Sequence, residues 1–168
     1  MDNLNLKEAL FSLAVTPEEF LEQTGRIIYD ATTYVLDGEE SLDELEGCEK
    51  TYIGTKVEKR FLKHWSLPVK KKGSTHKLDT VVVDQDVDIK FSISAKGSWM
   101  IPPEARDQWC LLMNMDWPNS YSIGVLKAEA HNLTQGANRD GKVSVSKVGK
   151  KNIEWLGRDV PLSGSSFI

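Results

Sequence analysis

Apolar side chains recur at helical spacing between residues 17 and 36, and this pattern predicts the first long helix of the chain. Thr16 is a good N-cap residue, Pro17 suits the first helical turn, and Glu19 completes a capping box with Thr16. Gly38 is expected to end the helix.

Two further helices are expected from similar spacing. The second runs over residues 51–65 and is followed by Pro68, which cannot continue a helix. The third covers residues 147–156 near the end of the sequence. Residues 38–49, between the first two helices, are acidic and are interpreted as a loop or a short helix.

Four segments have the β-branched and aromatic composition that is typical of strands. They cover residues 78–83, 86–94, 109–115 and 120–127, and the first two are expected to form a hairpin with a tight turn at residues 84–85. Helices and strands in this mixture predict an α/β (α+β) fold, in which helices flank a central sheet.

The stretch DQDVDIKFS, residues 84–92, alternates between polar and apolar side chains. Successive side chains of a strand point to opposite faces of the sheet. One face therefore carries Asp86, Asp88, Lys90 and Ser92, and the other carries Val87, Ile89, Phe91 and Ile93. The apolar row is expected to pack on the core, which leaves the polar row for another purpose.

A calcium-binding loop is excluded for this stretch. An EF-hand loop needs Gly at its sixth position and Glu at its twelfth. Counted from Asp84, these positions hold Ile89 and Ala95.

Folding the two strands back on each other brings a further carboxylate to the polar row. A two-residue turn at 84–85 sets Val81 opposite Asp88 and Asp79 opposite Lys90. Directly opposed residues share a face, so Asp79, Asp88 and Lys90 should lie close together. A one-residue slip of the register would scatter this group.

Two carboxylates beside an ammonium group match the chemistry of phosphodiester hydrolysis. Mg²⁺ prefers oxygen ligands and usually takes one or two carboxylates from a protein. A bound divalent ion lowers the pKa of an attacking water, and a lysine stabilises the negative charge that develops at phosphorus. This is the logic of the D-x(n)-[DE]-x-K nuclease site.

The residues alone also allow simpler interpretations. A charged strand face is often only solvated, and a second D-x-K pattern occurs at residues 140–142, in an expected turn over residues 138–141. The residues alone favour Glu58, on the second helix, as a surface partner of Lys59 or Lys63.

Several motifs in order along the chain resemble the endonuclease domain of the NaeI-type type II restriction enzymes. The similarity runs from about residue 50 to near the end of the chain. The motifs are TYIGTKVE at 51–58, LD at 78–79, VDIKFS at 87–92, WMIPPEA at 99–105, GANRDGK at 136–142 and IEWL at 153–156.

The resemblance implies a restriction-endonuclease-like core of the PD-(D/E)XK superfamily, related in fold to the mismatch-repair nickase MutH. Its active site maps to Glu58, Asp79, Asp88 and Lys90. Glu58, Asp79 and Asp88 would bind Mg²⁺, for which Mn²⁺ would substitute. The implied activity is cleavage of double-stranded DNA that leaves 5′-phosphates.

The resemblance also sets expectations for domain organisation. We expect one endonuclease domain over residues 1–168, with an acidic helical part at 1–50 and a catalytic core at 51–168. Relatives carry a second, C-terminal DNA-binding domain of topoisomerase-like type, which is not expected in 168 residues. Activation by effector DNA that depends on that domain should then be absent.

Charge is distributed unevenly along the chain, although the net charge is −4. Residues 1–50 hold 13 acidic and 3 basic side chains, whereas residues 51–168 hold 12 acidic and 18 basic ones. A basic remainder of this kind can meet phosphate groups, and ordinary solvated charge is the alternative.

Two basic segments are candidates for contact with DNA. Lys70, Lys71 and Lys72 lie in a polar loop and would neutralise backbone phosphates. The second segment holds Asn138, Arg139 and Lys142, whose side-chain types suit contacts in a DNA groove. The alternatives are a solvated loop and a plain turn, respectively.

Membrane segments, a signal peptide and cysteine usage indicate the cellular compartment in which the protein is expected. No apolar run approaches the length of a membrane-spanning helix, and the first 15 residues do not form a signal peptide. Cys48 and Cys110 form no C-x-x-C pattern, so free thiols in the reducing cytoplasm are expected. The three histidines show no ligand spacing, and Trp99, Trp109, Trp117 and Trp155 are expected in the core or in an interface.

The sequence therefore predicts a Mg²⁺-dependent, sequence-specific endonuclease of double-stranded DNA that acts as a homodimer on DNA. Dimerisation is expected because a two-fold symmetric protein matches a palindromic DNA site. The alternatives are a MutH-like nickase, a non-catalytic DNA-binding module with the same fold, and an interaction domain whose acidic part binds a basic partner.

Overall fold

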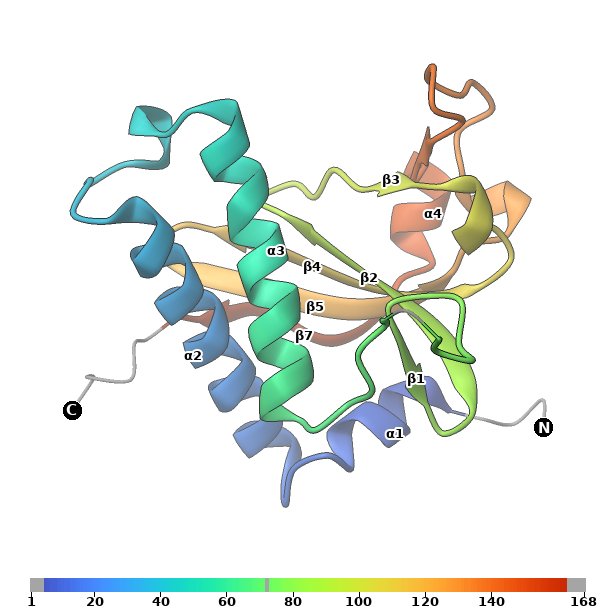
Figure 1. Ribbon diagram of the computed structural model, residues 1–168, viewed down its shortest axis with the longest axis horizontal. Helices are drawn as coiled ribbons and strands as arrows, with labels where there is room; N and C mark the ends of the chain where they lie inside the picture. The colour runs from blue at the N-terminus through green and yellow to red at the C-terminus, as the bar shows by residue number, and fades with distance from the viewer. Residues whose placement is uncertain (1–4, 72, 163–168) are drawn as a thin grey trace.

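A computed structural model describes residues 5–71 and 73–162 of the protein. Its centre is a five-stranded mixed sheet in the order β1-β2-β4-β5-β7, and a two-stranded sheet of β3 and β6 lies beside it (Figure 1). Among the described strands, only β2 and β4 pair in parallel. The strands are β1 Thr80–Val82, β2 Gln85–Ser92, β3 Met100–Ile101, β4 Trp109–Asp116, β5 Ser120–Lys127, β6 Val143–Ser144 and β7 Glu154–Pro161.

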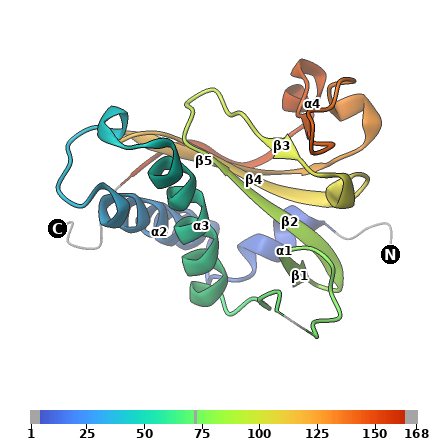
Figure 2. The same ribbon diagram turned by 45° about the horizontal axis from the view of Figure 1, so that its top comes forward.

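Helices lie on both faces of the central sheet. The three N-terminal helices cover one face, while α4 lies with β3 and β6 over the other (Figures 1 and 2). The α-helices are α1 Leu6–Phe11, α2 Pro17–Leu36, α3 Gly47–His64 and α4 Lys147–Lys151. Single 3-10 turns are η1 Leu42–Glu44, η2 Pro103–Ala105 and η3 Ala130–Asn132. This arrangement confirms the expected α+β class.

The two long helices begin where side chains can cap them. Thr16 Oγ1 accepts a hydrogen bond from the backbone N–H of Glu19 at 3.1 Å, as the sequence predicts for α2. The helix ends at Asp37, which adopts the left-handed conformation. The second helix, α3, starts four residues earlier than expected, because Glu46 and Glu49 form a capping box of their own.

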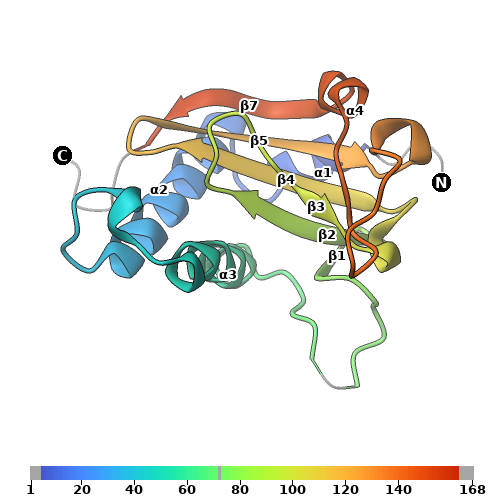
Figure 3. The same ribbon diagram turned by 90° about the horizontal axis from the view of Figure 1, so that it is seen from above.

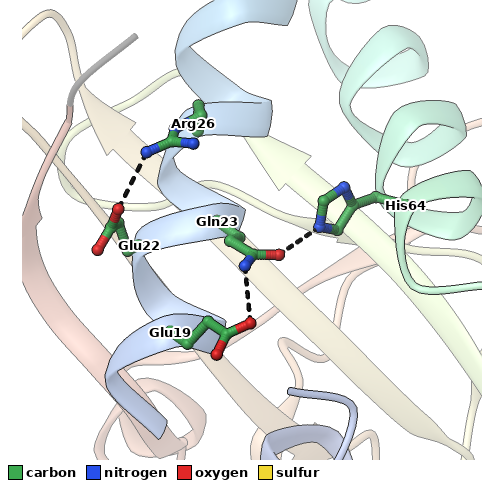
Figure 4. Close-up of polar contacts among 5 residues, drawn as sticks. All are labelled: Glu19, Glu22, Gln23, Arg26 and His64. Carbon is green, nitrogen blue, oxygen red and sulfur yellow. Dashed lines mark hydrogen bonds and ion pairs between the residues drawn. The ribbon is translucent and has the colours of Figure 1, made fainter. Parts of the chain in front are cut away.

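Polar side chains join α2 to α3 on their outer surface (Figure 4). Gln23 Nε2 donates to Glu19 Oε1 at 2.9 Å, so this carboxylate bonds within the helix. Gln23 Oε1 lies 2.6 Å from His64 Nε2 on α3. One turn further along α2, Arg26 and Glu22 form an ion pair at 2.9 Å. The histidine therefore has a structural partner at this position.

The end of the chain differs from its expected helix. The helix predicted over residues 147–156 is confirmed for residues 147–151 and wrong beyond them, because α4 stops at Lys151 and residues 154–161 form strand β7. β7 pairs with β5, with Trp155 opposite Gly124 and Glu154 opposite Val125. This pairing spans about 30 residues of sequence, so local periodicity does not reveal it.

The hairpin of β1 and β2 turns one residue earlier than expected. Its central residues are Val83 and Asp84, whose φ angles of 48° and 64° match a type I′ turn. The ladder pairs Val82 with Gln85 and Val81 with Asp86. Each residue of β1 thus lies opposite a partner two positions before the expected one, and a shift of two positions leaves every side chain on its expected face.

The central sheet separates two apolar clusters. On the helical face, Val87, Leu111 and Met113 pack with residues of α2 and α3 such as Phe20 and Phe61. On the other face, Cys110, Leu112 and Leu126 pack with Trp99 and Val143. Alternate residues of β2 and β4 therefore serve different layers, and the polar row of β2 belongs to the layer that holds β3 and β6.

Candidate functional site

Asp88 and Lys90 lie in the middle of β2, on the face opposite α2 and α3. Asp88 is only 5% exposed, whereas 29% of the Lys90 side chain is exposed. Lys90 Nζ lies 3.3 Å from Asp88 Oδ2, which makes an ion pair. The alternation predicted from the sequence thus brings these two charges together on one face.

Asp79 joins them from the segment that precedes β1. Its Oδ2 accepts a hydrogen bond from the backbone N–H of Ile89 at 2.7 Å. The ladder of β1 and β2 ends at Thr80 opposite Val87, so its continuation places Asp79 beside Asp88. The expected pairing of Asp79 with Lys90 is therefore wrong, although the three residues still converge.

Glu58 reaches the same group from α3, which packs against β2. Its neighbours Val57 and Phe61 are fully buried in the core and fix the rotation of the helix. The pKa of Glu58 is raised to about 7, chiefly by burial and then by the nearby charge of Asp79, while Lys90 opposes the shift. No ion pair joins Glu58 to a lysine of α3 in the part of the chain that the structure describes.

The pKa of Asp88 is set by its burial and by two charged neighbours, the carboxylate of Asp79 and the ammonium group of Lys90. Burial raises the pKa of Asp88 to about 7. The charge of Lys90 lowers it and that of Asp79 raises it, but neither cancels the effect of burial. The three acidic groups are thus close enough to repel one another when all are ionised.

The residues present fit a divalent cation of the Mg²⁺ type. The Oδ2 atom of Asp88 is buried and forms no hydrogen bond, and its close partner is Lys90 Nζ at 3.3 Å, so a second lone pair remains available to a cation. Within residues 5–71 and 73–162, no three acidic, histidine or cysteine side chains stand in a preformed ligand arrangement. Mg²⁺ usually takes only one or two carboxylates and keeps several waters, so Asp79 and Asp88 suffice.

Cys110 is a neighbour of the site that reasoning from the sequence did not identify. It lies directly opposite Asp88 in the parallel ladder of β2 and β4. Burial and the charge of Asp88 raise the pKa of the thiol to about 12, so it remains neutral beneath the carboxylates. Only the parallel pairing reveals this contact, and no local pattern in the sequence predicts that pairing. Cys48 is exposed, and both cysteines are free.

The lysine loop lies between α3 and β1 and extends away from the body of the molecule (Figure 3). Lys70 Nζ donates to the carbonyl of Lys77 at 2.7 Å, which holds the two sides of the loop together. Lys71 is exposed, and Lys72 lies outside the described residues. The loop is available to a partner, and its contact with DNA remains a prediction.

The predicted turn at residues 138–141 is confirmed. Asn138 Oδ1 accepts from the backbone N–H groups of Asp140 and Lys142, both at 2.9 Å. Arg106 Nη2 donates to the carbonyl of Gly141 at 2.9 Å and ties the turn to the start of β4. The side-chain oxygen of Asn138 is therefore used within the turn. Arg139 and Lys142 are exposed.

Trp99, Trp109, Trp117 and Trp155 lie in or beside the apolar clusters, as expected from the sequence. Trp99 is buried, and its Nε1 donates to the carbonyl of Met113 at 2.9 Å, while Trp109, Trp117 and Trp155 pack at the edges of the two clusters.

Among the described residues, none of the helices combines the length and the apolar character that a membrane crossing requires.

Comparisons with known proteins show similarity over most of the chain. The family model described as "Restriction endonuclease NaeI" matches residues 21–167. Among curated proteins, the type II restriction enzyme NaeI of Lentzea aerocolonigenes is 29% identical over 143 residues, which cover 82% of this chain and 43% of that enzyme. The chain thus spans less than half the length of that relative.

Proposed function

The chain belongs to the NaeI family of restriction endonucleases, and on this basis we propose that it is a Mg²⁺-dependent, sequence-specific endonuclease of double-stranded DNA. The observation that carries the proposal is the convergence of Asp79, Asp88 and Lys90 on one sheet face, with Glu58 beside them. A buried carboxylate cluster with a single lysine has little value for stability, because its charges repel one another. Its chemistry, in contrast, matches phosphodiester hydrolysis.

In the proposed reaction a water oxygen bonds to phosphorus and the bond from phosphorus to the 3′ oxygen breaks. The products are a 5′-phosphate and a 3′-hydroxyl group, which takes up a proton. Lys90 would orient the water and stabilise the additional negative charge on the phosphate oxygens. Its ammonium group is fixed for this purpose by its ion pair with Asp88.

Asp79 and Asp88 would hold the ion, with Glu58 as a further ligand or as a support for bound water. When bound, Mg²⁺ lowers the pKa of the attacking water and neutralises charge on the phosphate, and Mn²⁺ would substitute for it. The protein's own contribution is to hold these oxygen atoms together around the middle of β2 despite their repulsion. The hydrogen bond from Ile89 N–H to Asp79 serves this purpose.

The proposed enzyme has one domain, acts on double-stranded DNA and pairs with a second copy of the chain. We propose one endonuclease domain, in which the acidic N-terminal part supplies α2 and hence much of the core under the sheet. Double-stranded DNA is the proposed substrate, and two copies of the chain would act on a palindromic site. Lys70 and Lys71, with Lys72 beyond the described residues, would contact the backbone, and Arg139 and Lys142 would reach toward a groove.

Cleavage of supercoiled plasmid in Mg²⁺ tests the proposed function. We expect the wild type to give discrete linear fragments, and Asp88→Ala and Lys90→Ala to lose at least about 10²-fold in rate, because each removes charge stabilisation from the reaction. Asp86→Ala is the matched control, since Asp86 lies on the same strand without belonging to the cluster, and it should cut normally.

Other results would redirect the assignment. Accumulation of open circles without linear DNA would replace the endonuclease by a MutH-like nickase. Binding to DNA without cleavage at any enzyme concentration would indicate a non-catalytic module. Equal activity of Asp88→Ala and the wild type would contradict the assignment of the active site to these residues.

A further inference from the structure

A small cavity opens on the same sheet face as Asp88 and Lys90, but at the other end of the strands. Its volume is about 120 Å³, and it lies among the loop that follows β2, helix α4 and strand β7. Asn114 of β4 and Ser122 of β5 line it from the sheet. Lys96, Lys150 and Arg158 line it from the surrounding elements.

The charges around this cavity are mostly positive. Asp159 is the one acidic side chain in the lining, against three basic ones. None of the three cations forms an ion pair with a carboxylate inside the described ranges. Lys150 Nζ makes only a long contact of 3.4 Å with the carbonyl of Lys96, and the Arg158 guanidinium lies 4.8 Å over the Trp155 ring. Among the described residues, the lining therefore keeps an excess of positive charge.

Asn114 gives a second and independent indication of a ligand. The residue is only 6% exposed, and its Nδ2 donates to the carbonyls of Ser94 and Ala95 at 3.2 and 3.0 Å. These two bonds fix the orientation of the amide group. Its Oδ1 atom is then a buried acceptor without a hydrogen-bond partner in the structure. A buried polar atom of this kind costs free energy unless a donor reaches it, as an ordered water between protein and ligand would.

We propose that this cavity binds a phosphate group. Lysine and arginine side chains supply several charged donors at once, which is the usual chemistry of phosphate recognition. The volume suits one tetrahedral anion with its hydration water rather than a larger organic molecule. Asn114 and Ser122 give the cavity a polar floor, so a hydrated anion would not be placed against an apolar surface.

The phosphate can come from the DNA backbone or from a free anion, and the first source rests on the proposed function. Asn114 lies opposite Ser92, four residues beyond Asp88 on the same face. At about 3.3 Å per residue, this separation is about 13 Å along the strand. A DNA strand carries a phosphate at every nucleotide, so a cavity at this distance would hold a backbone phosphate beside the cleaved bond rather than the phosphate that is cleaved.

Salt-dependent DNA binding tests the proposal for the backbone. Fluorescence anisotropy with labelled duplex DNA is measured between low and moderate salt, with a chelator present so that no cleavage occurs. Lys150→Gln and Arg158→Gln should each weaken binding and reduce the slope of log K against log salt by about 0.9, the value for one lost phosphate contact. Lys151→Gln, on the same helix but outside the cavity, is the control and should match the wild type.

A titration with inorganic phosphate tests the cavity without DNA. Backbone amide signals of residues around Asn114 in the NMR spectrum of the wild type are followed, and Lys150→Gln with an unchanged melting temperature is compared. Saturable shifts that the variant loses, with normal salt slopes on DNA, would identify a free-anion site. No phosphate response together with unchanged slopes would overturn the proposal. Failure of the wild type to bind DNA would contradict only the proposed function, because the phosphate titration still decides whether the cavity is a site.

Discussion

Asp88 combines burial with a charge that its surroundings only partly compensate. Its pKa is raised to about 7 from an ordinary value of 3.8, chiefly by burial. The folded, metal-free protein therefore binds more protons than the unfolded chain between about pH 4 and 7. Asp88 therefore costs the folded state nothing below its ordinary pKa of 3.8, where it is protonated in both states. As the pH rises from there through 7, its buried carboxylate ionises and the free energy of unfolding falls. Glu58, with its pKa raised to about 7, acts in the same direction.

We predict that Asp88→Asn makes the metal-free protein more stable at pH 8, by roughly 1–2 kcal/mol, because the amide cannot carry the buried charge. The free energy of unfolding should also depend less on pH between 4 and 7 than in the wild type. Chemical denaturation at a series of pH values, in the presence of a chelator, measures both effects.

Two controls separate the cluster from general charge effects. Asp86→Asn removes an aspartate from the same strand and should leave the pH dependence unchanged. Millimolar Mg²⁺ or Ca²⁺ should raise the melting temperature of the wild type, since a ligand that binds only the folded state stabilises it. The same ions should have little effect on Asp88→Asn. A wild type that does not respond to either ion would contradict the metal assignment.

The candidate site was predictable from sequence only in part. Alternation along β2 is a local property, so it correctly separated Asp88 and Lys90 from Val87 and Ile89. Glu58 entered only through the family resemblance, because nothing in its local spacing distinguishes it from a surface glutamate. Cys110 was missed, because its place beside Asp88 depends on pairing between strands that 16 residues separate.

At the scale of elements, the β1–β2 hairpin contains a local conflict. Val83 adopts a φ of 48°, a left-handed conformation that is unfavourable for a β-branched residue. Asparagine and glycine are the residues that type I′ turns favour at this position. The side chain of Val83 is exposed and forms no part of the two apolar clusters, so packing does not repay this strain.

We predict that Val83→Asn stabilises the protein by about 1 kcal/mol, because it relieves strain without removing buried area. Thermal unfolding followed by circular dichroism measures the effect. Val83→Ile keeps the branched side chain and should give no gain. A lower melting temperature for Val83→Asn would show that the strain argument is wrong.

The elements differ in how far local sequence defines them. The strands predicted at residues 109–115 and 120–127 match β4 and β5 to within one residue, since an apolar run and a following turn are both local signals. Only residues 154–156 of β7 were assigned to a helix, and residues 157–161 carry no strand signal, since they include glycine, aspartate and proline, which strands disfavour. Its stability as a strand comes from β5, which is distant in sequence.

At the scale of the whole molecule, the proposed substrate imposes symmetry that one chain does not have. A palindromic duplex presents two equivalent scissile bonds, and one copy of the site described above serves only one of them. We predict that light scattering on the complex with an uncleaved cognate duplex gives two chains per DNA. A scrambled duplex of equal length should not give this stoichiometry. A stable complex with one chain per cognate duplex would favour a nickase.

The alternation along β2 also has an evolutionary consequence. Core packing and chemistry occupy interleaved positions of one short strand, so a change at Asp88 or Lys90 leaves the apolar row, and with it the fold, intact. On the proposed function, a lineage under pressure to silence a damaging nuclease would need only a single point mutation at one of these positions, and the apolar row of the strand would be unchanged. Well-folded, silent descendants are the expected remains of such episodes, and they would differ from active members mainly at every second residue of this strand.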